Sequence, residues 1–505
     1  MSVEKTKLTF FSKGKISEEQ VMVETIFNAT DAQKVLWVEA AAELETIDVL
    51  GKEVSFSGQT QFFALYLDQE NKVKTFETTV PFIGKAACEE LTVDAQVDLT
   101  CFVSGVEYVT KNSKLQCVVG VQGGYLIQND TEILCGGDED VCVKTAEISA
   151  QELIKAENIT FTEDISYPIS DKMENILRVK STVCVKNIEP NENFFTISGE
   201  IHTCIKYLNT NDEIARINTV NFSETFRREI EVSGLTEDGI VEAVARVDQS
   251  LFKYELDNET NKILISVPIK VLYRACSRVA LPSVQDVFSI SHNTNIITSS
   301  IHKFEVLRTE FFENKIEGSV QIDASLPRID KIVGFSNPNI VVTGFTKTED
   351  GLVVEGTIGF SVAFLNDELE QISSIYEEIP FKISVQLEDN QSQPTLVNAN
   401  FVDVDVLVRR GREIYIDGKL KTMVQLTTET VDAAIIDLQF TEELPIKTHA
   451  IEIYFGQKGD DLWDIAKELR VQPEIIVAQN PELVLPLEEP ENIVIYSTKT
   501  QGVSY

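Results

Sequence analysis

The stretch VSFSGQTQFFALYL, residues 54–67, recurs twice more along this chain, as FTISGEIHTCIKYL at 195–208 and LVVEGTIGFSVAFL at 352–365. Each copy contains a glycine nine residues before a leucine, and these glycines are Gly58, Gly199 and Gly356. An internal repeat at this spacing indicates that one structural unit is used several times. We therefore expect three homologous units in tandem.

The repetition extends to both sides of this stretch. An apolar residue precedes the glycine by 23, 23 and 24 residues in the three copies, and a phenylalanine follows it by 24, 23 and 25 residues. The upstream residues are Val35, Ile176 and Ile332, and the downstream ones are Phe82, Phe222 and Phe381. Further downstream, each copy has two long strand-like runs joined by a polar turn.

Within each copy the apolar residues alternate with polar ones. In residues 96–109 the predicted inward face carries Val97, Leu99, Cys101 and Val103. Such alternation predicts antiparallel strands with one buried face. Since no helix follows the repeated glycine, we interpret it as a bulge or a close backbone approach. The predicted fold is mainly β, with three tandem domains that are each a sandwich or a partly closed barrel.

The repeats place domain boundaries at 1–145, 146–285 and 286–440, followed by a separate module at 441–505. Residues 140–161 and 274–304 are predicted to be linkers between the repeats. The middle of the second linker is rich in Ser, Asn and Thr, which favours a hinge.

The last module has a different pattern. Residues 451–455 alternate as a short strand, with Ile451, Ile453 and Phe455 on one face. The sequence GQKGD then turns the chain, and either Asp460 or Asp461 can cap the helix that follows. That helix carries a core-facing apolar stripe, which consists of Leu462, Ile465, Ala466 and Leu469.

A second helix and a second strand complete this module. Pro473 suits the first turn of a helix, and that helix should end where Asn480 meets Pro481. Residues 492–496, NIVIY, read as the closing strand. The predicted order is βααβ.

The charge of the chain argues against several classes of partner. With 44 Lys+Arg and 81 Asp+Glu, the formal net charge is −37. Such a charge repels phosphate backbones and anionic lipid surfaces. No apolar run is long enough to span a membrane, and the first residues lack the apolar core of a secretory signal. We therefore expect a cytoplasmic protein that binds neither nucleic acid nor membrane.

No pattern in the sequence predicts catalysis, a metal or a cofactor. The four histidines are scattered, and phosphate-loop, dinucleotide-binding and nucleophile-elbow motifs are absent. Cys135 and Cys142 frame the acidic sequence CGGDEDVC, whose spacing is wrong for zinc, so we interpret it as a loop with reduced thiols. The sequence RRGRE, residues 409–413, is either a solvated turn or a contact for self-association.

Residues 451–498 resemble a LysM domain, in which a tyrosine-containing strand is followed by a G-D-T-L-W-x-I-A segment, two helices and an Asn-Pro. With that module at the end, the three repeats resemble SPOCS (spore coat and stalk) domains. This arrangement is similar to that of the SipL family of clostridial spore-coat morphogenetic proteins. The resemblance implies a non-enzymatic scaffold in the mother-cell cytoplasm that docks through its LysM domain onto SpoIVA, the ATPase at the forespore surface.

The LysM resemblance also implies a binding groove. One side would be formed by Gly459, Asp460, Asp461 and Leu462, and the other by Asn480, Pro481 and Leu483. Asp461 stands where the family usually has Thr or Ser, and a carboxylate only accepts hydrogen bonds. This favours a protein partner over the N-acetylglucosamine polymers that LysM domains commonly bind. Trp463 either anchors that interface or covers the edge of a small core.

Two other functions remain open at this stage. The module could bind peptidoglycan, and the chain could be a self-assembling subunit of a spore outer layer or appendage. Repeated units on one chain would raise avidity once a first unit is anchored.

Overall fold

The computed structural model describes residues 2–169, 173, 175–209, 216–257, 259–349, 351–366, 371–387, 392–445 and 451–496. The chain is mainly β-strand, as predicted, and its strands form several separate sheets. Within the described strands no sheet closes on itself. None of the described helices is long and apolar enough to cross a membrane.

A similar strand order recurs three times along the chain, with one strand divided in two in the second unit and another in the third. The first unit contains β1 (Val3–Ile26), β2 (Ala32–Leu50), β3 (Glu53–Asp68), β4 (Val73–Ala87), β5 (Gln96–Val109) and β6 (Lys114–Gly137). The second contains β7 (Val141–Pro168), β8 (Asn175–Asn191), β9 (Phe194–Asn209), β10 (Arg216–Glu231), β11 (Ile240–Val247), β12 (Lys253–Asp257) and β13 (Lys262–Ser289). The third contains β14 (His292–Gln321), β15 (Ile329–Phe335), β16 (Asn339–Thr348), β17 (Gly351–Asn366), β18 (Ile372–Val385), β19 (Gln393–Arg409) and β20 (Glu413–Glu443).

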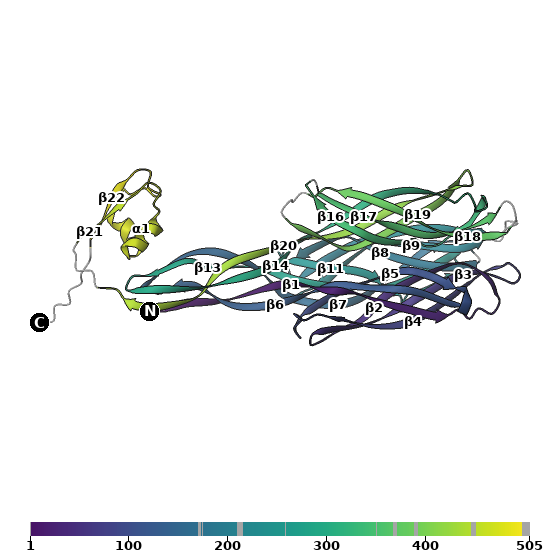
Figure 1. Ribbon diagram of the computed structural model, residues 1–505, viewed down its shortest axis with the longest axis horizontal. Helices are drawn as coiled ribbons and strands as arrows, with labels where there is room; N and C mark the ends of the chain where they lie inside the picture. Colours follow the sequence, from purple (N-terminus) through teal and green to yellow (C-terminus); the bar gives the residue numbers. More distant parts are fainter. Residues whose placement is uncertain are drawn as a thin grey trace.

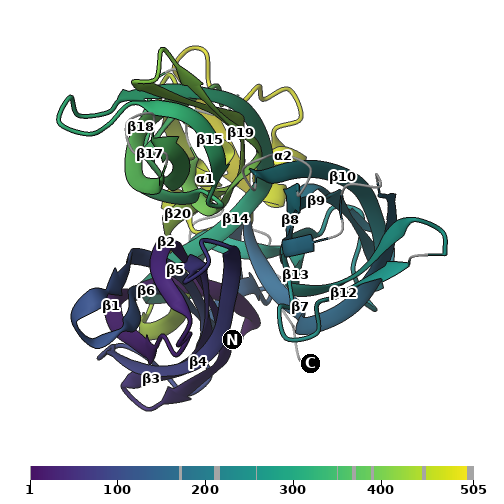
Figure 2. The ribbon, with the colours of Figure 1, turned by 90° about the vertical axis from the view of Figure 1, so that its right-hand side faces the viewer.

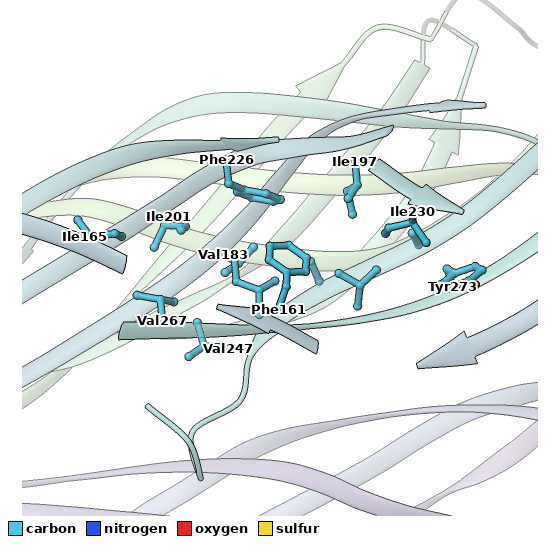
Figure 3. Close-up of a cluster of buried hydrophobic side chains, with 14 of the residues drawn as sticks. Phe161, Ile165, Val183, Ile197, Ile201, Phe226, Ile230, Val247, Val267 and Tyr273 are labelled. Carbon is cyan, nitrogen blue, oxygen red and sulfur yellow. The ribbon is translucent and has the colours of Figure 1, made fainter. Parts of the chain in front are cut away.

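Each unit is built from two layers of antiparallel strands. In one layer the last long strand pairs with the first, as in β1–β6, β7–β13 and β14–β20. The other layer is a meander whose central strands are β3, β9 and β17. Side chains from both layers form one core per unit, and Figure 3 shows this for the second unit, where Phe161 and Val267 lie opposite Ile201 and Phe226. The predicted inward face of β5 is confirmed, since Leu99 and Val103 are buried in the first core.

The repeated glycines lie at the same place in each unit. Each glycine faces a register shift in one neighbouring strand and a phenylalanine in the other. A Cβ on Gly58 would lie 2.2 Å from the carbonyl oxygen of Glu43 and 2.6 Å from the ring of Phe82. The close approach expected from the sequence is therefore confirmed. In the second unit the ring opposite Gly199 belongs to Phe226. The equivalent of Phe82 and Phe381 is therefore Phe226, and the prediction of Phe222 from the spacing is wrong.

The two segments predicted to be linkers are strands. Residues 141–161 belong to β7, and residues 274–304 comprise the end of β13, a short turn and the start of β14. The six long strands, two from each unit, continue beyond the cores as a narrow shaft, visible at the left of Figure 1. The shaft comprises residues 3–11, 126–137, 141–153, 276–289, 292–306 and 426–443. One interior cluster takes a side chain from each strand: Leu8, Ile133, Ile148, Leu281, Ile301 and Ala434.

The three units pack around a common axis, as the view in Figure 2 shows. Their contact includes an apolar cluster with side chains from all three units, such as Trp37, Ile217 and Val333. Beside it lies a buried polar group. Arg178 of the second unit forms an ion pair with Glu39 of the first, and Glu39 also accepts hydrogen bonds from the backbone and side-chain nitrogens of Asn337 of the third, at 2.8 and 3.0 Å.

The C-terminal module has the predicted βααβ order. It consists of β21 (Ile451–Gly456), α1 (Leu462–Leu469), α2 (Pro473–Gln479) and β22 (Glu491–Tyr496). The two strands pair antiparallel. The stripe expected in α1 is confirmed, because Ile465, Ala466 and Leu469 are buried and Leu462 packs against the same cluster. The module lies beside the narrow end of the shaft (Figure 1).

Candidate docking site

The residues of the predicted groove hold the C-terminal module together. Asp460 accepts hydrogen bonds from the Tyr454 hydroxyl at 2.9 Å and the Gln457 backbone N–H at 2.8 Å. Burial, together with the hydrogen bond to Asp460, raises the pKa of Tyr454 to about 12. Gly459 has a φ of +98°, a conformation that favours glycine. These contacts fix the turn that leads into α1.

The second side of the predicted groove is also bound internally. The Asn480 side chain donates to the carbonyl oxygens of Ile476 and Val494 and accepts from the Val494 N–H. It therefore connects the end of α2 to β22. Pro481 is exposed and Leu483 is partly buried, with its backbone N–H bonded to the carbonyl oxygen of Asn480.

Asp461 is the N-cap of α1. Its carboxylate accepts a hydrogen bond from the Asp464 backbone N–H at 2.8 Å, in the manner typical of helix starts. Of the two aspartates that could cap the helix, the structure selects this one. Ser, Thr and Asp are all favourable caps. Capping alone explains an aspartate at this position. The replacement of Thr or Ser by Asp461 therefore does not favour a protein partner over a glycan.

Trp463 is buried, with 9% of its surface exposed, and packs against the end of the shaft. Its ring lies 5.1 Å from that of Phe288, measured between centroids. Its indole N–H donates to Asp286 at 2.8 Å, and the ammonium of Lys467 binds the same carboxylate at 2.6 Å. Of the two roles expected for Trp463, the structure is in line with packing at the edge of the small core, and the ring also contacts the shaft because one side of α1 faces it.

Further contacts join the module to the shaft tip, which we define as residues 138–144 and 286–291. Arg470 donates to the carbonyl oxygen of Ser289 at 3.1 Å, and Gln472 donates to that of Glu139 at 3.0 Å. Lys144 lies 3.3 Å from Asp461. These shaft residues lie in or next to the turns that join the first unit to the second and the second to the third, so the module contacts the end of the shaft where these turns lie.

The surface left open lies on the other side of the module. Ile451, Ile453, Phe455 and Tyr496 are 53, 50, 69 and 54% exposed. Ile451 pairs with Tyr496 across the two strands, and Ile453 pairs with Val494. These residues form one outward apolar face, which we call the sheet face. The sequence pattern placed Ile451, Ile453 and Phe455 together but gave no sign that their side is exposed.

Other candidate features carry no recognisable reactive chemistry. All eight cysteines are free, and Cys142 is buried against the C-terminal module. Burial raises the pKa of Cys142 to about 11, which keeps it a thiol. In RRGRE, Arg412 donates to the carbonyl oxygens of Asp323 and Leu326, so this turn is bound within its own unit. Among the described residues no cluster of His, Cys, Asp or Glu is placed to hold a metal.

Comparison with known proteins gives one match. Residues 31–111 and 172–255 each match the family model described as SipL, SPOCS domain. These ranges cover β2–β5 of the first unit and β8–β11 of the second, which carry the repeated stretch and its bulges. No curated protein and no solved structure matches the chain.

Proposed function

We propose that this SipL-like chain, whose SPOCS domains place it with a family of sporulation-related coat proteins, is a non-enzymatic scaffold of spore-coat assembly. The SPOCS match over the first two units is the observation that supports the proposal most. The third unit repeats their strand order, and its glycine Gly356 faces a register shift and Phe381 as in the other two. We therefore assign it as a third SPOCS domain.

The C-terminal module is assigned as a LysM-type domain that docks onto SpoIVA, the coat-basement ATPase. The sheet face is the surface we propose for this contact. Exposed aromatic and aliphatic side chains gathered on one face are typical of protein interfaces. The shaft tip covers the side of the module that holds Trp463 and leaves the sheet face open. The ATPase chemistry belongs to the partner.

The test is binding of the purified full chain to the purified SpoIVA of the same organism. Phe455→Ser removes the most exposed ring of the sheet face without touching a core. Loss of an interface aromatic costs about 2 kcal/mol or more, so we expect affinity to fall by roughly 30-fold. Ile83→Ser, which changes an equally exposed side chain on the first unit, is the matched control and should bind normally.

Two outcomes would contradict this assignment. If Phe455→Ser binds SpoIVA as tightly as the unchanged chain, the sheet face is not the interface. If the unchanged chain does not bind SpoIVA but is retained by purified peptidoglycan, the module is a glycan reader. Light scattering of the chain alone tests the third alternative, because a self-assembling coat subunit would form large particles without any partner.

A further inference from the structure

A cleft of about 610 Å³ opens between the first and second units. The first unit contributes residues of β2, β3 and β4, and the second contributes β8, β12 and the start of β13. Its charged lining consists of Arg178, Lys180, Lys253, Glu77 and Glu255. Three cations in one cleft are notable in a chain whose formal net charge is −37.

Two cations of this lining, Lys180 and Lys253, have no ion pair within the described chain, and Lys180 is the less exposed of the two. It is partly buried, and within the described chain its ammonium has neither an ion pair nor a hydrogen bond. Its neighbour Arg178 is paired with Glu39, whose carboxylate also binds Asn337. Glu39 thus already accepts three hydrogen bonds, from Arg178 and from both nitrogens of Asn337. Burial and the neighbouring charge of Arg178 lower the pKa of Lys180, and the nearby carboxylate of Glu39 offsets them only in part.

In a second cleft, between the second and third units, the lysines are paired with carboxylates of the chain itself. This cleft has a volume of about 230 Å³ and is lined by Lys186 and Lys421. Both lysines form ion pairs with Glu200, and Lys421 also pairs with Glu313 at 3.1 Å. The lysines of this second cleft are therefore neutralised by the chain itself, whereas among the described cations of the first cleft only Arg178 is paired in this way.

We propose that the cleft between the first two units binds a carboxylate, with Lys180 as its main charge partner and Lys253 as a second cation. A partly buried ammonium is stabilised by a paired negative charge, and a carboxylate supplies one negative charge and acceptor oxygens. Glu77 and Glu255 in the same lining disfavour a doubly charged phosphate. The carboxylate can come from a small organic acid or from an acidic side chain of a peptide.

The experiment is titration calorimetry on the full chain at constant ionic strength, with sodium acetate in one arm, a pentaglutamate peptide in a second and sodium phosphate in a third. We expect saturable binding in at least one of the two carboxylate arms. Charge-assisted hydrogen bonds are worth about 1.5–3 kcal/mol, so Lys180→Met should weaken binding by roughly tenfold or more. Lys186→Met, in the second cleft, should leave it unchanged.

Each result bears on the proposal. Binding of acetate identifies a small acid as sufficient, and binding of pentaglutamate alone identifies a peptide as the source. Removing an unpaired buried charge should not unfold the chain, and Lys253→Met, at a more exposed position, gives a second variant with a smaller expected loss. Equal binding by Lys180→Met and the unchanged chain, tighter binding of inorganic phosphate than of acetate, or no saturable heat would each overturn the proposal.

Discussion

At the scale of single residues, Trp463 decides how the C-terminal module is attached. Its ring is buried against Phe288, and its N–H is bound to Asp286. Removal of a buried tryptophan typically costs about 3–5 kcal/mol. We expect Trp463→Ala to accelerate hydrogen exchange throughout α1 and at the shaft tip. Trp463→Phe keeps most of the packing and loses only the donor, so its effect should be much smaller. Unchanged exchange in Trp463→Ala would mean that the ring is exposed in solution.

Asp461 gives a second prediction at this scale. Because it caps α1, Asp461→Ala should destabilise the module by about 1 kcal/mol, seen as faster exchange of the Asp464 amide. Asp461→Thr should be nearly neutral, since threonine is also a cap. The ion pair with Lys144 is exposed on both sides and adds little, so Lys144→Ala should resemble the unchanged chain. If Thr is as damaging as Ala, capping is not the role of Asp461.

These two residues also show the limits of sequence reasoning. The apolar stripe of α1 and its N-cap Asp461 lie within a few residues of one another, so the helix could be predicted from local pattern. The partner of Trp463 lies 177 residues earlier in the chain, in a segment that read as a linker. No local signal connects the two. The resemblance to a LysM domain directed attention to the groove, whereas the open surface is the sheet face.

At the scale of elements, the contact between α1 and the end of β13 should depend on pH. Burial opposes ionisation of Asp286, but the hydrogen bonds from Lys467 and Trp463 outweigh it and lower its pKa. A lowered pKa in the docked state means that the contact is fully stable above the ordinary aspartate value of about 4 and weakens as pH falls below it. The near-ultraviolet circular dichroism of Trp463 should report this loss.

Asp286→Asn is the control for this acid effect. It removes the charge that Lys467 pairs with, so the contact should be weaker at neutral pH and less sensitive to acid. A remaining acid effect is expected from Asp461, whose pKa is lowered mainly by its hydrogen bond from the Asp464 backbone. An acid transition of the same size in Asp286→Asn and the unchanged chain would rule out Asp286 as the titrating group.

The elements themselves were predicted unevenly. Alternation and the repeated glycine identified the strands and their bulges, because both depend on residues close in sequence. The prediction of linkers was wrong for a physical reason. The outer halves of β7 and β13 belong to the shaft, where they pair with each other but pack their side chains against strands of the other units. Polar residues such as Thr298, Ser299 and Ser300 in β14 then read as a hinge, although pairing with β20 holds them in a strand.

At the scale of the whole molecule, the three units pack into one body and are not independent domains joined by linkers. Six long strands interleave in the shaft, and the apolar cluster around Trp37 joins the units again at the cores. Whether the repeats pack together could not be read from the sequence, since each unit is internally complete. Their fixed arrangement means that any binding surfaces on the three units are presented at set distances from the docked C-terminal module.

The ion pair between Glu39 and Arg178 tests this rigid arrangement. Burial opposes the charge on Glu39, yet Arg178 beside it keeps the pKa of the carboxyl lowered, so the pair is ionised. Removal of one partner leaves a buried charge without compensation, which typically costs about 3–5 kcal/mol. Glu39→Leu should therefore loosen the contact among the units, seen as a larger radius in solution scattering and an earlier denaturant midpoint.

The double variant Glu39→Leu with Arg178→Met distinguishes this mechanism from general damage to the fold. Replacement of both charges by apolar side chains often costs little or is stabilising, so the double variant should regain most of what Glu39→Leu loses. The hydrogen bonds that Asn337 donates to Glu39 are lost in both variants. The double variant should therefore not recover the stability that these bonds contribute. If the double variant is as loose as the single one, the uncompensated charge of Arg178 is not the cause, and the contacts of Glu39 itself, including those with Asn337, hold the units together.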